Sequence, residues 1–327
     1  MFAYVVRRLL AAIPVLIVAS FIAYALVALS GDPLEPLKIR NPPAPQRTID
    51  LETARLGLDE NIFVRYWHWL TGVLQGNFGE SVQSNYDIGE NLARSTVVTL
   101  RLVVVAMLLA LILAVITGVL SAVRQYSKFD YATTFLGFVF LAMPSFWIAI
   151  VLKDLAVRYN KATGTTVFYT IGEKSQNYDS LSPFGKFGDL AGHLILPTIA
   201  LALISYAAWS RYQRAAMLEV LNSDYVRLAR AKGLAWRQVL TRHVLRTALI
   251  PLVTVTALDI AAILGGAVIT ETVFNWNGLG RMLLTGVGRA DTNAVAGWLL
   301  LAGLVVIIFN VIADVLYAVL DPRIRHE

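Results

Sequence analysis

Long apolar stretches alternate with shorter polar segments along most of this 327-residue chain. A helix needs about 20 mostly apolar residues to cross a bilayer. Six stretches approach or exceed that length, the fourth being the shortest: residues 9–29, 97–123, 131–152, 194–210, 248–270 and 294–320. The pattern therefore predicts an all-α membrane protein with six transmembrane helices.

Composition and charge agree with this prediction and orient the chain. Hydrophobic residues make up 57% of the chain and charged residues only 15%, which is too little polar material to cover a soluble globule of this size. With the N-terminus in the cytoplasm, the inside segments hold 14 Lys and Arg in 59 residues, and the outside segments hold 13 in a little over twice that length. The positive-inside rule predicts this asymmetry. Both termini are therefore expected to be cytoplasmic, and the net charge of +6 needs no nucleic-acid partner.

The spans and polar segments divide the chain into four parts: residues 1–30 with the first span, a small extracytoplasmic subdomain over 31–96, a membrane core over 97–320, and a tail over 321–327. The subdomain opens with a Pro-rich stretch that we expect to lack regular structure. Apolar residues at helical spacing between Leu56 and Leu74 then predict an amphipathic helix. Residues 153–192 have no sustained periodicity and are expected to form an irregular loop.

A basic segment over residues 211–247 separates the fourth and fifth spans. Asn222, Ser223 and Asp224 offer N-cap oxygens there, and Gly233 is a natural stop, so a short helix is predicted between them. An amphipathic segment resting on anionic lipid is the alternative. Lipid explains the charge but not the cap and the stop together, so we expect a surface that docks a partner.

The predicted short helix carries a stripe of small residues. Tyr225, Ala229 and Gly233 are spaced four apart, so a large ring is followed on one face by two residues with almost no side chain. We expect a partner to approach closely along this stripe. Arg227, Arg230 and Lys232 lie beside it and suit acidic side chains or carbonyl groups of that partner.

Catalytic motifs are absent from the sequence. It contains no phosphate-binding loop of the form G-x-x-x-x-G-K-[ST], no G-x-S-x-G turn and no H-E-x-x-H helix. The four histidines stand far apart without acidic partners at ligand spacing, so neither a metal site nor another cofactor is expected. We therefore expect that the chain is not an enzyme.

Two acidic residues fall inside the predicted spans, Asp259 and Asp314. Such residues either line a pathway or make polar contacts between helices. Near the outer end of the fifth span, Glu271, Thr272 and Phe274 are further candidates for a pathway or an outer gate. An ion-gradient-driven secondary transporter, with the two aspartates carrying the ion, is therefore an alternative function.

Several blocks of sequence resemble permease subunits of ATP-binding-cassette (ABC) importers, specifically the oligopeptide and dipeptide branch. The blocks are YVVRRLLAAIPVL (4–16), LGLDENIFVRYWHWLTGVLQGNFGES (56–81), MPSFW (143–147), DYVRLARAKGL (224–234), RHVLRTALIP (242–251), GGAVITETVFNWNGLG (265–280) and DPRIR (321–325). Such permeases have a cytoplasmic loop with the pattern Glu-Ala-Ala, three further residues and then Gly, and this loop docks in a groove of the ATPase. Ala229 and Gly233 match this pattern, whereas Arg227 and Leu228 stand at the acidic and first alanine positions.

The resemblance implies a type I ABC importer permease fold, with a coupling helix between the fourth and fifth spans, in the bacterial inner membrane. It implies as partners a second homologous permease, two ATPase subunits or one two-domain ATPase that bind ATP and Mg, and an extracytoplasmic substrate-binding protein. Short peptides are the implied substrate, with nickel chelates, glutathione or another peptide-like solute as alternatives. The implied ATPase-coupling residues are Asp224, Tyr225, Arg227, Leu228, Ala229, Arg230, Ala231, Lys232 and Gly233.

Overall fold

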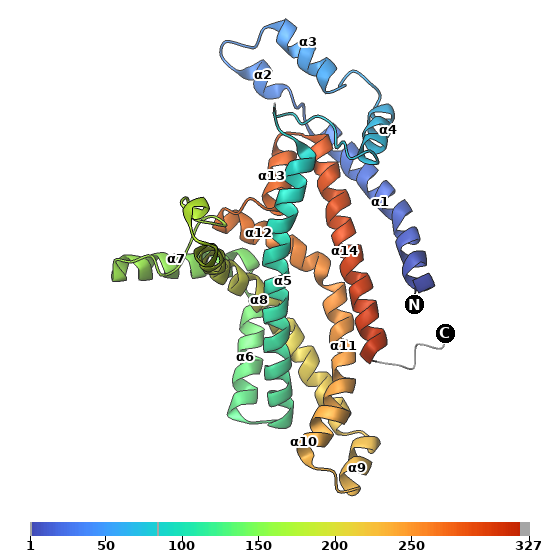
Figure 1. Ribbon diagram of the computed structural model, residues 1–327, viewed down its shortest axis with the longest axis vertical. Helices are drawn as coiled ribbons and strands as arrows, with labels where there is room; N and C mark the ends of the chain where they lie inside the picture. Colours follow the sequence, from blue (N-terminus) through green and yellow to red (C-terminus); the bar gives the residue numbers. More distant parts are fainter. Residues whose placement is uncertain (1, 84, 321–327) are drawn as a thin grey trace. The chain divides into compact units, whose positions relative to one another are not determined.

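The computed structural model describes residues 2–83 and 85–320, and it is helical throughout, with no strand in these two ranges (Figure 1). The tail over 321–327, with its DPRIR block, lies outside the described residues. The elements are α1 (Phe2–Ser30), α2 (Glu35–Ile39), α3 (Gln46–Arg55), α4 (Ile62–Val73), α5 (Ile88–Val123), α6 (Lys128–Ala142), α7 (Ser145–Thr163), η1 (Tyr178–Ser180), α8 (Pro183–Leu221), α9 (Asp224–Ala231), α10 (Trp236–Val239), the π-helical turn η2 (Leu240–Val244), α11 (Leu245–Leu258), α12 (Ile260–Phe274), α13 (Leu279–Gly288) and α14 (Thr292–Leu320).

Within the described residues, five helical segments are long and apolar enough to cross a membrane, and the bent pair α6 and α7 raises the number to six if it forms one span. The predicted all-α membrane architecture is confirmed. The fourth span was predicted over 194–210 only, but α8 runs from Pro183 to Leu221. Its polar ends continue the helix beyond the apolar stretch that hydropathy detects.

The third predicted span, 131–152, is not one continuous helix. It breaks between Ala142 and Ser145, and α7 leaves α6 at an angle of 105° (Figure 1). Met143 is extended, with φ −86° and ψ 130°, because the ring of Pro144 disfavours a helical conformation in the residue before it. Pro144 then starts α7 as its N-cap. Met143 and Pro144 therefore separate two helices within this apolar stretch.

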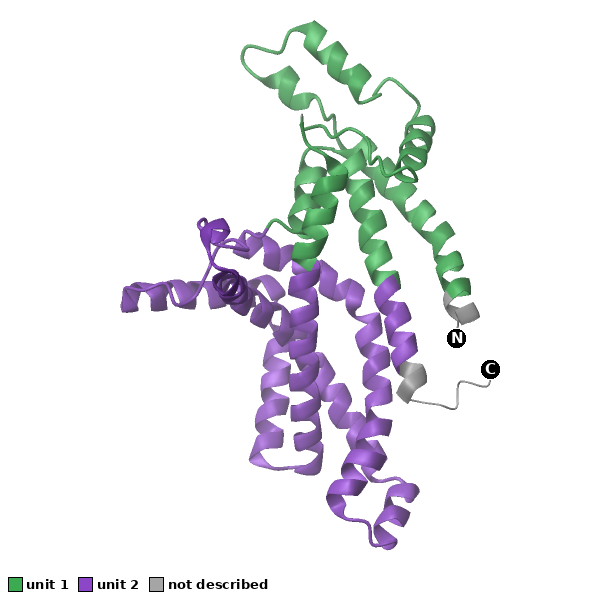
Figure 2. Cartoon of the chain, in the orientation of Figure 1, with its two compact units in different colours: residues 1–99, 277–307 green, residues 100–276, 308–327 purple. Residues whose placement is uncertain are grey.

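Two compact units make up the chain: residues 1–99 with 277–307, and residues 100–276 with 308–327 (Figure 2). In the second unit, α8 packs against α6, α7, α11 and α12. It also meets α5 closely at Gly118, where an added Cβ would lie 2.8 Å from the Cβ of Gln213 and 2.9 Å from the carbonyl oxygen of Ser210. The helix that leads into the predicted docking segment is thus the centre of its unit.

In the first unit, aromatic rings hold α4 against α1. Tyr66 and Trp69 of α4 are buried beside Tyr24 of α1, and the rings of Tyr24 and Tyr66 meet edge to face with centroids 5.7 Å apart. The Tyr66 hydroxyl donates to the carbonyl oxygen of Ile17 at 2.9 Å, and the Trp69 indole donates to that of Phe78 at 3.0 Å. These contacts fix the subdomain to the first membrane helix.

The predicted outer helix is shorter than expected, and the Pro-rich stretch is more regular. Because the Asn61 side chain accepts a hydrogen bond from the Phe63 backbone at 2.9 Å, α4 begins at Ile62 and not near Leu56. The expectation that the Pro-rich stretch lacks regular structure was wrong in part. Helix α2 forms within it, since Pro36 occupies an early helical position that needs no backbone N–H.

We predict that Gly118→Ala destabilises the fold by about 1–3 kcal/mol, because the added methyl group meets a fully buried side chain and a backbone oxygen that cannot both withdraw. Thermal unfolding of the purified protein in detergent measures this. Gly188→Ala, in α8, is the matched control, since a Cβ there meets nothing within 4 Å. Equal melting temperatures for the two variants would contradict the close packing of α5 on α8.

Candidate coupling surface

Helix α9 (Asp224–Ala231) forms where the sequence predicted a short helix, but its start differs from the prediction. Ser223 is the N-cap by backbone position, yet no side chain caps the helix. The Ser223 hydroxyl instead donates backwards to the carbonyl oxygen of Val220 at 2.6 Å, which ties α9 to the last turn of α8. At the other end Gly233 has a φ of +77°, the left-handed conformation that glycine adopts without steric cost. The predicted stop is confirmed.

Only part of the predicted small-residue stripe faces outward, because Tyr225 and Gly233 are exposed and Ala229 is buried. Val226 and Ala229 are buried in an apolar cluster of the same chain, together with Met217 of α8, Val239 of α10 and Val244 of η2. The expectation that a partner packs along Ala229 was therefore wrong. A side chain as small as alanine lets α9 lie close to its own neighbours.

A different face of α9 is exposed, and we call it the α9 outer face: Tyr225, Arg227, Leu228 and Arg230. Leu228 is 56% exposed and Tyr225 is 44% exposed, so two large apolar groups stand free of the chain's own core. Basic groups surround them in ordered positions. Arg227 pairs with Asp224, and the Arg230 guanidinium lies 4.0 Å from the centre of the Trp236 ring.

Arg214, two turns before the end of α8, is bound to the start of α6. Its Nε and one terminal nitrogen donate to the two Asp130 carboxylate oxygens at 2.6 and 2.7 Å, a two-point contact that fixes direction as well as distance. Asp130 also accepts from the Ser121 hydroxyl at the end of α5 and from the Tyr126 backbone at 2.9 Å. This buried carboxylate therefore joins α5, α6 and α8 at one point, and its partner Arg214 lies close in sequence to α9.

Asp259, a predicted pathway candidate, makes a polar contact between helices. It stands between α11 and α12, and its carboxylate accepts a hydrogen bond of 2.7 Å from the indole of Trp209, which is fully buried in α8. The fifth predicted span, 248–270, is interrupted at this residue. Asp314 lies half-buried on α14.

The other pathway candidates lie in the last turns of α12. Glu271 and Phe274 are buried, whereas Thr272 is exposed and its hydroxyl bonds back to the carbonyl oxygen of Val268 at 2.8 Å. Residues of other segments bind the carbonyl groups at the end of α12. The Gly172 backbone donates to the carbonyl oxygen of Phe274 at 2.8 Å, and the Lys153 ammonium donates to the carbonyl oxygen of Val273. The expectation of an irregular loop over 153–192 was wrong at both ends, because α7 continues to Thr163 and α8 begins at Pro183. The connecting residues 164–182 contribute the contact from Gly172 to this turn.

Sequence reasoning missed the contact between Asp130 and Arg214. In the sequence, Arg214 is one of several basic residues in the segment 211–247, and Asp130 directly precedes the third predicted span. The two residues are far apart in sequence, and no local spacing pattern joins them. The one available signal was an acidic residue at the edge of an apolar stretch, where a buried partner is usual.

Comparison with known proteins gives the same family over both halves of the chain. Residues 114–326 match the family described as "Binding-protein-dependent transport system inner membrane component", and residues 1–91 match the N-terminal region of such membrane components. The chain is 41% identical to the oligopeptide transport system permease protein OppB of Mycobacterium tuberculosis, over 98% of both chains. It is 37% identical to the oligopeptide permease AppB of Bacillus subtilis and to the dipeptide permease DppB of Escherichia coli, over 100% of each chain.

A solved structure supports the fold. The chain is similar to a chain of the MetNI methionine ABC transporter in an inward-facing conformation, with a TM-score of 0.52, 17% identity, and coverage of 70% of this chain and 96% of the other. The two family matches and the full-length relatives give one consistent answer. This chain belongs to the family of binding-protein-dependent transport system inner membrane components, the permease subunits of ABC importers.

Proposed function

We propose that the chain is a transmembrane permease subunit of an ATP-driven importer of short peptides. The observation that carries this proposal is the similarity over the whole length to permeases that are named for oligopeptide and dipeptide transport. The chain supplies half of the translocation pathway. Nickel chelates, glutathione and other peptide-like solutes are the alternative substrates that a transport assay has to separate from peptides.

The assembly contains partners for the tasks that this chain does not perform. A second homologous permease completes the pathway, two ATPase subunits or one two-domain ATPase bind ATP and Mg, and an extracytoplasmic binding protein delivers the substrate. Both termini and the segment around α9 lie in the cytoplasm, as the charge distribution supports. Residues 31–96 form a subdomain on the opposite side.

The α9 outer face docks in the ATPase. A docked apolar side chain with arginines around it combines burial with directional contacts, the combination that dominates protein interfaces. Lys232 and Ala231 lie at the edge of this face, and Gly233 ends the helix so that the chain can turn back into α10. Movement of the ATPases on binding ATP then displaces α9 and opens the pathway outward by alternating access.

Helix α8 carries this displacement into the membrane core. The Ser223 hydroxyl ties α9 to α8, Arg214 binds α8 to α6 and α5 through Asp130, and Trp209 binds it to the junction of α11 and α12 through Asp259. Each tie is directional, so α8 moves its neighbours instead of sliding past them. Glu271, Thr272 and Phe274 at the end of α12 then form part of the outer gate, and Asp314 borders the pathway.

Reconstitution tests the function itself. In proteoliposomes, the chain with its second permease, ATPase subunits and binding protein should accumulate labelled short peptides only when ATP is supplied to the ATPase side. The chain alone should accumulate none. Uptake by the chain alone under an ion gradient would establish the secondary transporter instead, and uptake of nickel chelates or glutathione without peptides would reassign the substrate.

A substitution on the α9 outer face tests the docking role. Leu228→Glu places a charge where an apolar group is buried in the complex, and we expect retention of the ATPase on the purified permease to fall by about tenfold, since burial of a leucine contributes about 1.5–3 kcal/mol. Uptake should fall in parallel. Thr241→Glu, which adds the same charge at an exposed position of η2, is the matched control and should retain the ATPase. Full retention in the Leu228 variant would remove α9 from the interface.

A double-mutant cycle tests the role of Arg214 and Asp130. Asp130→Asn and Arg214→Gln each leave one polar group of the pair without its charged partner, and loss of one partner from a buried pair costs about 3–5 kcal/mol of stability. Combining them leaves neither charge unpaired, so the melting temperature should recover. If the pair transmits force, uptake per ATP hydrolysed should remain about five- to tenfold low in the double variant. Recovery of that ratio together with the melting temperature would show a purely structural role.

A further inference from the structure

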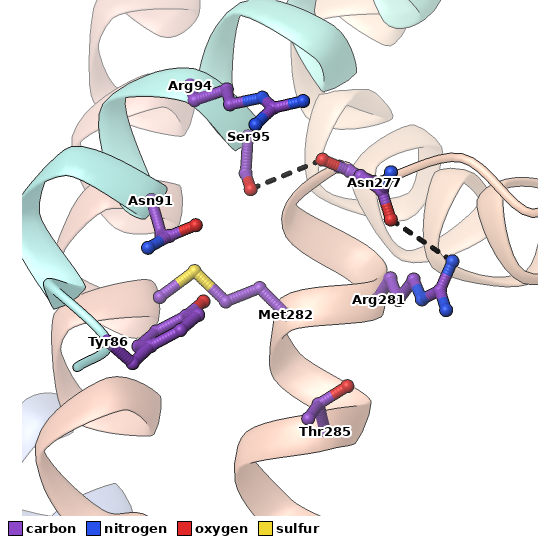
Figure 3. A pocket seen from close by; sticks show the side chains of 9 residues that line it. Tyr86, Asn91, Arg94, Ser95, Asn277, Arg281, Met282 and Thr285 are labelled. Atoms are coloured by element: carbon purple, nitrogen blue, oxygen red, sulfur yellow. Dashed lines mark hydrogen bonds between the residues drawn. The ribbon is translucent and has the colours of Figure 1, made fainter. Parts of the chain in front are cut away.

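A polar cleft in the first unit has no part in the coupling described above. It has a volume of about 190 Å³ and lies between the start of α5, with the turn before it, and the first turns of α13. Arg94 comes from α5 and Arg281 from α13, and the remaining polar lining includes Tyr86, Asn91 and Thr285 (Figure 3). The helix α5 is 36 residues long, more than a bilayer needs, so its first turns extend beyond the hydrocarbon.

The cleft is built by hydrogen bonds between its two sides. The Ser95 hydroxyl of α5 donates to the backbone oxygen of Asn277 at 3.3 Å, and the Arg281 guanidinium donates to the Asn277 side-chain oxygen at 3.1 Å (Figure 3). Nearby, the Leu279 backbone donates to the Thr99 hydroxyl at 2.8 Å. Ser95 and Thr99 of α5 therefore join that helix to the residues that begin α13, and Asn277, in the loop just before α13, orients the Arg281 guanidinium.

The chemistry of the lining favours an anion. Two arginines line the cleft, and among the described residues no aspartate or glutamate lines it. Asn91, Thr285 and the Tyr86 phenol supply neutral donors, and burial raises the pKa of Tyr86, so its hydroxyl keeps its proton at neutral pH. Asp87 and Glu90 lie nearby in sequence, but the Asp87 carboxylate is engaged in capping the start of α5 through the Glu90 backbone at 2.8 Å.

The size of the cleft selects the kind of anion. Pockets that enclose small-molecule ligands usually measure about 300–1,000 Å³, so this one is small for a peptide. It has room for the carboxylate head of one side chain that projects from another protein. Opposite charge at such a contact guides encounter and fixes orientation.

We propose that this cleft receives an aspartate or glutamate side chain of the extracytoplasmic binding protein when that protein docks. The assignment rests on the proposed function, which supplies the partner and places residues 86–95 and 277–285 outside the membrane. Arg94 and Arg281 bind the carboxylate, and Asn277 orients the Arg281 guanidinium.

Docking of the binding protein to the complete transporter in lipid nanodiscs tests the proposal. The double variant R94Q/R281Q should bind the protein about tenfold more weakly than wild type, and the dependence of its affinity on salt should be smaller, because two charges have left the interface. Hydrolysis of ATP without binding protein should stay unchanged. R289Q removes an equivalent charge from the end of α13, outside the cleft lining, and is the matched control. Equal weakening by R289Q, or unchanged docking of the double variant, would overturn the proposal.

A second measurement separates a carboxylate contact from a disturbed fold. A photo-crosslinking residue at Thr285, on the exposed edge of the cleft, should join the permease to a segment of the binding protein that contains an aspartate or glutamate. Crosslinks only to lipid or to the second permease would overturn the assignment. If the wild-type transporter itself binds no external protein, the proposed function fails as well, and this result is distinct from a loss seen only in the variants.

Discussion

The second unit depends on one charged contact, the two-point bond between Arg214 and Asp130. Asp130 is almost fully buried, and a buried carboxylate is tolerated only when its oxygens have partners. It has three: the Arg214 guanidinium, the Ser121 hydroxyl and the Tyr126 backbone. Because these partners belong to three different segments, the requirement to satisfy one carboxylate sets where α5, α6 and α8 meet.

That requirement gives α8 a role beyond crossing the membrane. Apolar helices in lipid have little reason to prefer one rotation over another, so polar ties decide their positions. Helix α8 has such ties at Arg214 and at Trp209, and Ser223 follows at its end. Because α8 is bound to its neighbours at several points along its length, a displacement of the attached α9 would move the neighbouring helices of the unit with it.

Much of this architecture was predictable because its causes are local. Apolar length predicted the membrane helices, and the left-handed preference of glycine predicted the end of α9 at Gly233. The features that the sequence did not predict depend on residues far away in the chain. Ala229 and Val226 are buried because Met217 and Val239 lie opposite them, which no spacing within α9 reveals. The sharp break at Pro144 could not be predicted from the proline alone, because a proline can either kink a helix or end it.

The π-helical turn η2 has a consequence for the register of the chain. Val239, Val244 and Ala248 all face the same apolar cluster, although the first two are five residues apart. In an uninterrupted α-helix, residues five apart point in directions about 140° apart, so only the wider turn brings both valines to one side. The wider turn therefore accommodates one extra residue between α9 and α11. Removing one residue would leave a regular α-helix with the two valines four apart and still about 40° from each other, whereas closing the turn into α-helix without a deletion would rotate all of α11 by about 100° against the cluster that now receives it.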